Sequence, residues 1–232
     1  MRFFSIIIPA HNEEAIIGET LGHLAHLDYP ADRLEILVVE NGSSDRTLEK
    51  AQRFSSDRCK VLSTTTRGVS HARNLGARHA SLAADWYIFL DADTSLPPRF
   101  LTNLDAYLDT HPNAAYGTTD MRPDRVNLAS RMWYGYTNVT DRLIRVTHAV
   151  HIVRRDLAER VSFDETLRSS EIVVYCRALA KYGAYFYMKG NPVINSARRM
   201  EKVGYLKMTW LNIWHGILPR RLLQKRDWDV IR

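Results

Sequence analysis

The sequence of 232 residues is poor in cysteine and has no long apolar run. Its two cysteines, Cys59 and Cys176, are too few and too far apart for a zinc cluster or a disulfide framework. No apolar stretch approaches the roughly 20 residues that cross a bilayer. The apolar start, residues 3–10, has no cleavage site and is followed at once by Glu13 and Glu14. We therefore expect a reduced, cytoplasmic protein whose first apolar run is a strand.

Most of the chain also lacks an excess of either charge. From residue 198 to the end there are nine Lys or Arg and three Asp or Glu, a net charge of +6, which equals the net charge of the whole sequence. The tail therefore carries the entire imbalance. Because the charge is confined to the tail and no recognition motif accompanies it, nucleic acid is not an expected partner.

Strand-like and helix-like segments alternate four times in the first 100 residues. Short apolar runs at 5–8, 35–39, 60–62 and 86–90 fit buried strands. Helix-like stretches separate them, including a helix expected from about residue 69 to 83. This alternation predicts an α/β fold with a mainly parallel central sheet flanked by helices. After a helix ending near 110, we expect a strand at 114–119, a polar and aromatic substrate-facing insertion at 120–147, and a helix at 172–182.

Two carboxylates follow the last of these early strands directly. Asp91 and Asp93 are two positions apart, so in extended backbone both face the same side. Hard oxygen ligands at a strand end suit Mg²⁺ or Mn²⁺ holding a diphosphate. Residues 9–11 and 40–41 follow two other strands, and ligands bind at the carboxyl ends of such sheets. An ordinary surface turn would also produce Asp-x-Asp, but the convergence of three strand ends favours a site.

Six segments of the chain resemble, in order and spacing, those of the family 2 glycosyltransferases, which are inverting enzymes with the GT-A fold. The segments are SIIIPAHNE at 5–13, VVENGSSD at 38–45, ARNLG at 72–76, FLDAD at 89–93, FDE at 163–165, and Ser170-Glu171 leading into 176–179. The likeness spans about residues 3–200. It implies a glycosyltransferase domain over 1–200, with a nucleotide-binding half at 1–95 and an acceptor and catalytic half at 96–200.

The resemblance also implies roles for individual residues. The nucleotide-sugar site would consist of Pro9, Ala10, His11, Glu13, Glu40, Arg73, Asp91, Ala92 and Asp93. In it, His11 and Glu13 belong to the loop that holds base and ribose, and Glu40 takes the place of the family's uracil-binding Asp. Arg73 would approach the diphosphate. Asp93 would ligate the metal, and Asp91 would face the ribose or a metal-bound water. The alternatives are a plain surface loop residue for His11, a carboxylate at a helix start for Glu40 and an exposed helical arginine for Arg73.

The general base is where the chain departs most from the family. The family supplies it from a Glu-Asp pair at the start of a late helix, but here Glu171 is followed by Ile172, which cannot take a proton. Glu171 itself is the first candidate, and Asp164 and Glu165 are the runners-up. A phosphate-headed acceptor would need no base. A second departure is Val161-Ser162, where members often have Gly-Gly next to the sugar.

The basic tail has two predicted parts. Arg198 and Arg199 resemble a segment that folds over the diphosphate as a lid in one subgroup of the family; a solvated basic turn is the alternative. Residues 201–232 form a basic, amphipathic helical extension, in which 204–223 is rich in Trp and Leu. Such a segment suits an anionic membrane surface on the cytoplasmic side. Packing on the domain or on a second subunit, as in a homo-oligomer, is the alternative.

The sequence thus predicts a metal-dependent glycosyltransferase that uses a nucleotide sugar, UDP-linked, and a saccharide or lipid-linked acceptor. A silent nucleotide-sugar binding protein of the same fold is the alternative that Ile172 motivates. A nucleotidyltransferase would carry a Gly-rich, basic phosphate loop after the first strand, and Pro9-Ala10-His11-Asn12 lacks one.

Overall fold

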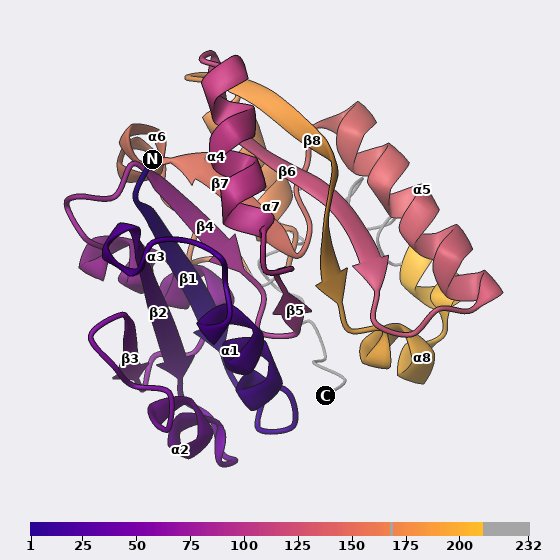
Figure 1. Cartoon of the computed structure of the whole chain (residues 1–232). Helices are drawn as coiled ribbons and strands as arrows, with labels where there is room; N and C mark the ends of the chain where they lie inside the picture. The colour runs from indigo at the N-terminus through magenta and orange to yellow at the C-terminus, as the bar shows by residue number, and fades with distance from the viewer. Residues whose placement is uncertain (168, 211–232) are drawn as a thin grey trace.

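The structure is a computed structural model that describes residues 1–167 and 169–210. A mixed sheet runs through the middle of the molecule, with helices on both of its faces (Figure 1). The described part of the chain contains no helix of the length and apolar character needed to cross a membrane.

The sheet has eight strands in the order β3-β2-β1-β4-β7-β6-β8-β5. They are β1 (Phe4–Ala10), β2 (Leu34–Asn41), β3 (Cys59–Thr64), β4 (Trp86–Leu90), β5 (Thr94–Ser95), β6 (Ala114–Pro123), β7 (Val150–Arg154) and β8 (Ala184–Asn195). The neighbours among β1 to β4 pair in parallel, as does β6 with β8, whereas β7 runs antiparallel to β4 and β6. The predicted α/β fold with a mainly parallel sheet is confirmed.

Eight α-helices and one 3₁₀ turn, η1 (Ala31–Arg33), are assigned within the described residues. The helices are α1 (Ile17–Ala25), α2 (Thr47–Gln52), α3 (Val69–His79), α4 (Phe100–Thr110), α5 (Leu128–Ile144), α6 (Arg155–Arg160), α7 (Glu171–Leu179) and α8 (Arg198–Val203).

Alternation along β1 creates a core on each face of the sheet. Successive side chains of a strand point to opposite faces. Accordingly, Ile6 and Ile8 pack with apolar residues of α1 and α4, whereas Ile7 packs in a second cluster that includes residues of α6 and α7. All three isoleucines are fully buried. The parallel strands are covered on both sides, so the loops at their carboxyl ends are held on a rigid base.

Gly76 of α3 is required by the close approach of that helix to the sheet. A Cβ at this position would lie 2.3 Å from Cγ2 of Ile7 and 3.2 Å from Cγ2 of Val39. We expect Gly76→Ala to destabilise the protein by about 1–3 kcal/mol, the usual cost of overpacking. Gly22→Ala in α1 is the matched control, since nothing lies within 4 Å of its Cβ, and it should stabilise by about 0.5–1 kcal/mol. Urea unfolding measures both, and a Gly76→Ala variant as stable as wild type would contradict this packing.

Two local expectations differ from the structure. The segment 120–147, expected as a substrate-facing insertion with no assigned helix, finishes β6 and then forms α5, which begins with a capping box between Asn127 and Ser130. The helix expected to continue to residue 83 ends at His79, because Ala80 adopts an extended conformation. The predicted extension covers residues 201–232 and contains the amphipathic segment 204–223. Its part after Trp210 lies outside the described residues.

Candidate active site

A cleft of about 1730 Å³ lies beside the carboxyl ends of β1 and β4. Strand order places β2 on one side of β1 and β4 on the other, which is the switch point where α/β sheets bind ligands. Nine of the predicted site residues line this cleft: Pro9, His11, Glu13, Arg73, Asp91, Ala92, Asp93, Glu171 and Arg199. The runner-up Glu165 lines it too. Segments almost 190 residues apart in the chain therefore meet at one place.

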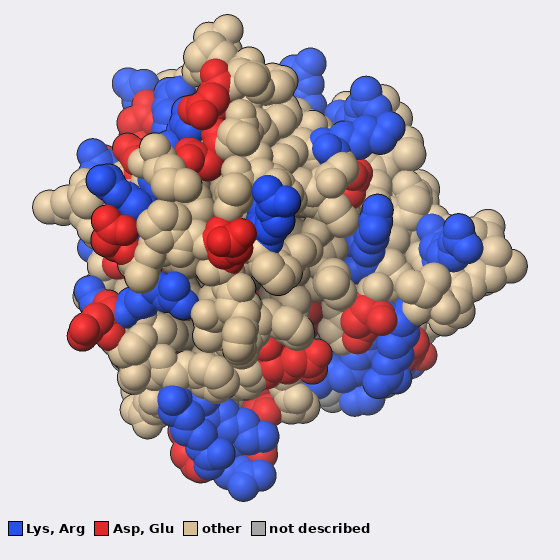
Figure 2. All heavy atoms as spheres, viewed as in Figure 1, with Lys and Arg blue, Asp and Glu red and all other residues tan. Residues whose placement is uncertain are grey.

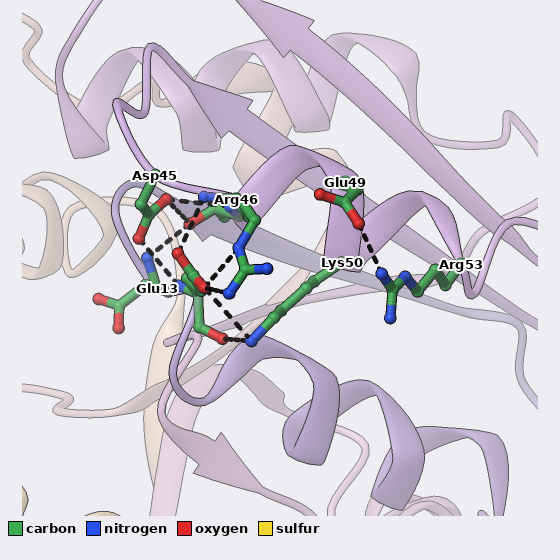
Figure 3. Close-up of polar contacts among 8 residues, drawn as sticks. Glu13, Asp45, Arg46, Glu49, Lys50 and Arg53 are labelled. Carbon is green, nitrogen blue, oxygen red and sulfur yellow. Dashed lines mark hydrogen bonds and ion pairs between the residues drawn. The ribbon is translucent and has the colours of Figure 1, made fainter.

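The loop after β1 is fastened to the loop after β2. His11 Nδ1 lies 3.0 Å from the carbonyl oxygen of Asn41, and the Glu13 amide donates to Thr47 Oγ1 at 2.7 Å. Next to it, the Glu14 carboxylate pairs with Arg46 and Lys50 of the α2 region. Figure 3 shows that the Glu13 carboxylate points away from this cluster. The network therefore fixes the loop backbone and leaves Glu13 turned to the cleft.

Asp93 is a partly buried carboxylate among other negative charges. Burial, together with the charges of Asp91 and Glu13, raises the pKa of Asp93 to about 7, although Arg198 and Arg199 oppose the shift. Its Oδ1 accepts a hydrogen bond from Asn195 Nδ2 at 3.1 Å. Because the ionised form of Asp93 is unfavourable in these surroundings, a bound cation would stabilise it.

Arg73 connects the acidic motif to the start of α7. Its Nη2 donates to Asp91 Oδ1 at 2.9 Å and its Nη1 to Glu171 Oε1 at 3.2 Å, while its guanidinium lies over the Phe163 ring. The Arg73 side chain is only 4% exposed. The alternative of an exposed helical arginine is therefore wrong. In this structure the guanidinium fork is occupied by two carboxylates and holds them in fixed relative positions.

Glu171, the first residue of α7, faces the cleft with one oxygen uncommitted. Its Oε1 accepts from Arg73, and no described residue donates a hydrogen bond to Oε2. Ile172, which replaces the family's Asp, packs against the second core cluster. The helix start is set by Ser170, whose backbone is left-handed with φ of 57°.

The two runner-up carboxylates are placed differently. Both oxygens of Glu165 are engaged, Oε1 by Asn74 Nδ2 at 2.8 Å and Oε2 by His71 Nδ1 at 2.8 Å. These contacts join the 163–167 loop to α3. Asp164 Oδ1 accepts from the amide and the hydroxyl of Thr166, so it supports its own turn, and it does not line the cleft.

Three other predicted residues do not line the cleft themselves. Ala10 is fully buried, and Glu40 is 4% exposed, with its carboxylate bound to the Ser43 amide and the Ser63 hydroxyl. Its neighbour Asn41 lines the cleft instead. Arg198 donates to Glu13 Oε2 at 3.2 Å, and this contact ties the start of α8 to the first loop.

Sequence reasoning missed a histidine–aspartate pair in the same cleft. His148 Nδ1 lies 2.5 Å from Oδ1 of the buried Asp141 of α5. Burial lowers the pKa of His148, but the charge and hydrogen bond of Asp141 outweigh it and hold that pKa above its ordinary value. The seven-residue spacing of Asp141 and His148 did not suggest this contact. It depends on the end of α5, where Arg145 adopts a left-handed backbone conformation with φ of 57° and the chain turns back.

Asn195 was also missed as a site residue. Its amide nitrogen donates to Asp93, and its Oδ1 accepts from the Tyr134 hydroxyl at 2.7 Å. The tyrosine of α5 thus orients the amide that supports the acidic motif. An Asn at the end of a late strand carries no sequence signal for this contact.

The residues present fit a divalent cation that also binds the substrate, rather than one held by protein alone. No cluster of three or more His, Cys, Asp or Glu with metal-binding geometry occurs among the described residues. Mg²⁺ commonly binds one or two carboxylates and completes its shell with phosphate oxygens and water. The partly buried Asp93, with Asp91 beside it, matches that donor set.

Comparison with known proteins agrees with the geometry. The family model described as glycosyl transferase family 2 matches residues 5–163, more than half of the chain. The poly(ribitol-phosphate) β-N-acetylglucosaminyltransferase TarS of Staphylococcus aureus is 30% identical over 114 residues, 48% of this chain and 20% of TarS. The probable glycosyltransferase YdaM of Bacillus subtilis is 41% identical over 97 residues, 39% of this chain and 23% of YdaM. These matches thus span less than a quarter of either relative.

Solved structures share the fold over almost the whole chain. Residues 1–349 of S. aureus TarS superpose with a TM-score of 0.71 at 21% identity, covering 95% of this chain and 68% of the other. A mannosyltransferase from Pyrobaculum calidifontis, solved with GDP-Man and Mn²⁺, gives 0.70 at 22% identity, covering 96% and 68%. The architecture is that of the GT-A glycosyltransferases. With the match to the family model, it follows that the chain belongs to glycosyltransferase family 2.

Proposed function

We propose that this chain transfers a sugar from a UDP-linked donor to a hydroxyl group of a saccharide or lipid-linked acceptor, with inversion and with the help of Mg²⁺ or Mn²⁺. The observation that carries the proposal is the convergence of the β1 loop, the Asp91–Asp93 motif and the start of α7 on one cleft. The TarS structure with UDP-GlcNAc, which has the same fold, supports the choice of a UDP sugar. The mannosyltransferase with Mn²⁺ supports the metal.

In this proposal the first loop and the acidic motif hold the donor. His11 and Asn41 lie together at the carboxyl ends of β1 and β2, where a nucleoside would fit. Asp93, with Asp91, would hold the cation, whose positive charge offsets the negative charge that builds on the departing nucleotide. Arg198 and Arg199 bring further positive charge from α8, as the predicted lid requires.

Glu171 is the residue that we assign as general base. Its Oε2, to which no described residue donates a hydrogen bond, would take the acceptor's hydroxyl proton while the acceptor oxygen bonds to the anomeric carbon. The bond from that carbon to the phosphate oxygen breaks at the same time, and the nucleotide diphosphate leaves with the electron pair. Attack from the face opposite the leaving group inverts the anomeric configuration. The bound Arg73 keeps Glu171 oriented.

Release of nucleotide from a panel of nucleotide sugars tests the proposed function. With Mn²⁺ or Mg²⁺ and candidate acceptors, we expect turnover with UDP sugars in preference to GDP sugars, and none in EDTA. The median kcat of enzymes is about 10 per second, so a coupled assay would detect even a rate about a thousandfold lower. Tight donor binding without release for any donor and acceptor would instead favour the silent binding protein that Ile172 motivates.

A further inference from the structure

The outer face of α5 carries a line of exposed apolar side chains. Leu128, Met132, Tyr136, Val139 and Leu143 are exposed by 75, 68, 41, 57 and 74%. Their spacings of four, four, three and four residues put them on one side of a helix at about 100° per residue. The inner side of α5 is buried through residues such as Trp133 and Tyr134. This apolar line, here called the α5 stripe, is about 22 Å long at 1.5 Å per residue.

The stripe is an unusual surface for a water-exposed helix. Helices normally turn polar residues to solvent, whereas α5 buries Thr137 and Asp141 and exposes leucine, methionine and valine. The helical residues 205–210 lie next to α5, since the Tyr205 ring is 6.4 Å from that of Trp133. They expose Leu206 by 89%. Because Trp133 lies on the buried side of α5, Leu206 is a separate exposed apolar side chain and is not counted in the stripe.

The charges around the stripe are almost all positive. Exposed arginines in and around α5 are Arg122, Arg125, Arg131, Arg142 and Arg145, of which Arg125 is paired with Glu201 of α8 at 3.6 Å. The segment 121–147 has only two acidic residues, and both are turned to protein partners: Asp124 accepts from the Ala197 amide and Asp141 is buried against His148. Figure 2 shows Lys and Arg spaced over the α5 and α8 side, with uncharged surface and a few Asp and Glu between them.

We propose that the α5 stripe and its arginines bind the surface of an anionic lipid bilayer. Apolar side chains enter the boundary of the acyl chains while flanking arginines contact anionic headgroups, as in interfacial helices. A second copy of this chain is a poorer occupant, because a two-fold interface would set this arginine-rich surface against itself. The charge of the surface thus selects the membrane over self-association.

The stripe adjoins the opening of the cleft. Tyr136 of the stripe, Ile144 and Arg145 also line the cleft. A bilayer against α5 would therefore lie at the cleft mouth, where an acceptor carried by a lipid could enter without leaving the membrane. This consequence for the acceptor rests on the proposed function, whereas the docking itself does not.

Co-sedimentation of the full chain with vesicles tests the proposal. Vesicles of equal parts phosphatidylcholine and phosphatidylglycerol should bind the protein, and vesicles of phosphatidylcholine alone should bind it at least about tenfold more weakly. Binding should fall in about 1 M salt, where the Debye length is about 3 Å. The double variant Met132→Glu/Val139→Glu should lose binding by about tenfold or more. Arg131→Glu/Arg142→Glu should lose binding to anionic vesicles as well.

Leu82→Glu is the matched control, since Leu82 is 84% exposed but lies in the turn after α3. It should bind vesicles like wild type, and circular dichroism checks that every variant is folded. The proposal would be overturned if the wild-type protein did not bind anionic vesicles, or if a folded stripe variant bound them as strongly as wild type. So would a stripe variant that changes a dimer into a monomer without changing vesicle binding. None of these readouts depends on donor turnover, so the proposed function stands or falls separately.

Discussion

Glu171→Gln should reduce sugar transfer by about 10²–10⁴-fold and leave donor affinity unchanged. This is the usual contribution of a general base, and glutamine keeps the shape and the hydrogen bond from Arg73 but cannot take a proton. The loss should therefore appear in kcat and not in KM for the donor. Transfer is measured by nucleotide release, and donor affinity by calorimetry.

Glu165→Gln is the control for this experiment, because Glu165 lines the same cleft but both of its oxygens are engaged by Asn74 and His71. It should keep most of the transfer activity. If Glu171→Gln remains active and His148→Gln does not, the assignment to Glu171 is wrong and the Asp141–His148 pair is the base. If both variants remain active, the acceptor arrives ionised, as a phosphate would.

Asp93→Asn should abolish the effect of Mn²⁺ on donor binding. Loss of an outer-shell partner already costs about 10–100-fold in metal affinity, so removal of a direct ligand should cost at least as much. Calorimetry of UDP-GlcNAc with Mn²⁺ and with EDTA measures the effect. Wild type should bind more tightly with the metal, and the variant should bind equally in both. Unchanged metal dependence in the variant would refute the role of Asp93.

Although Asp93→Asn should weaken metal-dependent donor binding, it should increase the stability of the folded protein in the absence of metal. Burial and the charges of Asp91 and Glu13 raise the pKa of Asp93 to about 7, above its ordinary value of 3.8. The ionised form therefore destabilises the folded state, and this penalty grows as the pH rises from about 4 to 7. Without metal at about pH 8, Asp93→Asn should melt several degrees above wild type, with a smaller gap at about pH 5. A variant that melts lower would mean that lost binding reflects damaged folding.

The strands and the acidic motif could be predicted because their signals are local. Buried parallel strands read as continuous apolar runs, and Asp91 and Asp93 follow one directly. Parallel strands also share a carboxyl edge, so the meeting of the β1 and β4 loops follows from topology. The family resemblance supplied Glu171 as the only carboxylate at the start of α7.

The contacts of the site residues were not predictable, since they depend on pairs far apart in sequence. Arg73 reaches Glu171 across 98 positions, and Asn195 reaches Asp93 across 102. Glu40 matched the family's motif by position, yet its side chain supports its own turn. The α5 stripe was not predicted, because the polar residues between its members obscured the helical spacing of the apolar ones within 120–147. A cytoplasmic location, self-association and the division at residue 95 stay predictions.

A crystal structure of the protein with UDP-GlcNAc and Mn²⁺ tests the central claim most directly. The account predicts the uridine beside His11 and Asn41, the diphosphate and metal at Asp93, and the anomeric carbon turned toward Glu171. A nucleotide bound elsewhere on the molecule, or a diphosphate without contact to Asp91 or Asp93, would contradict it.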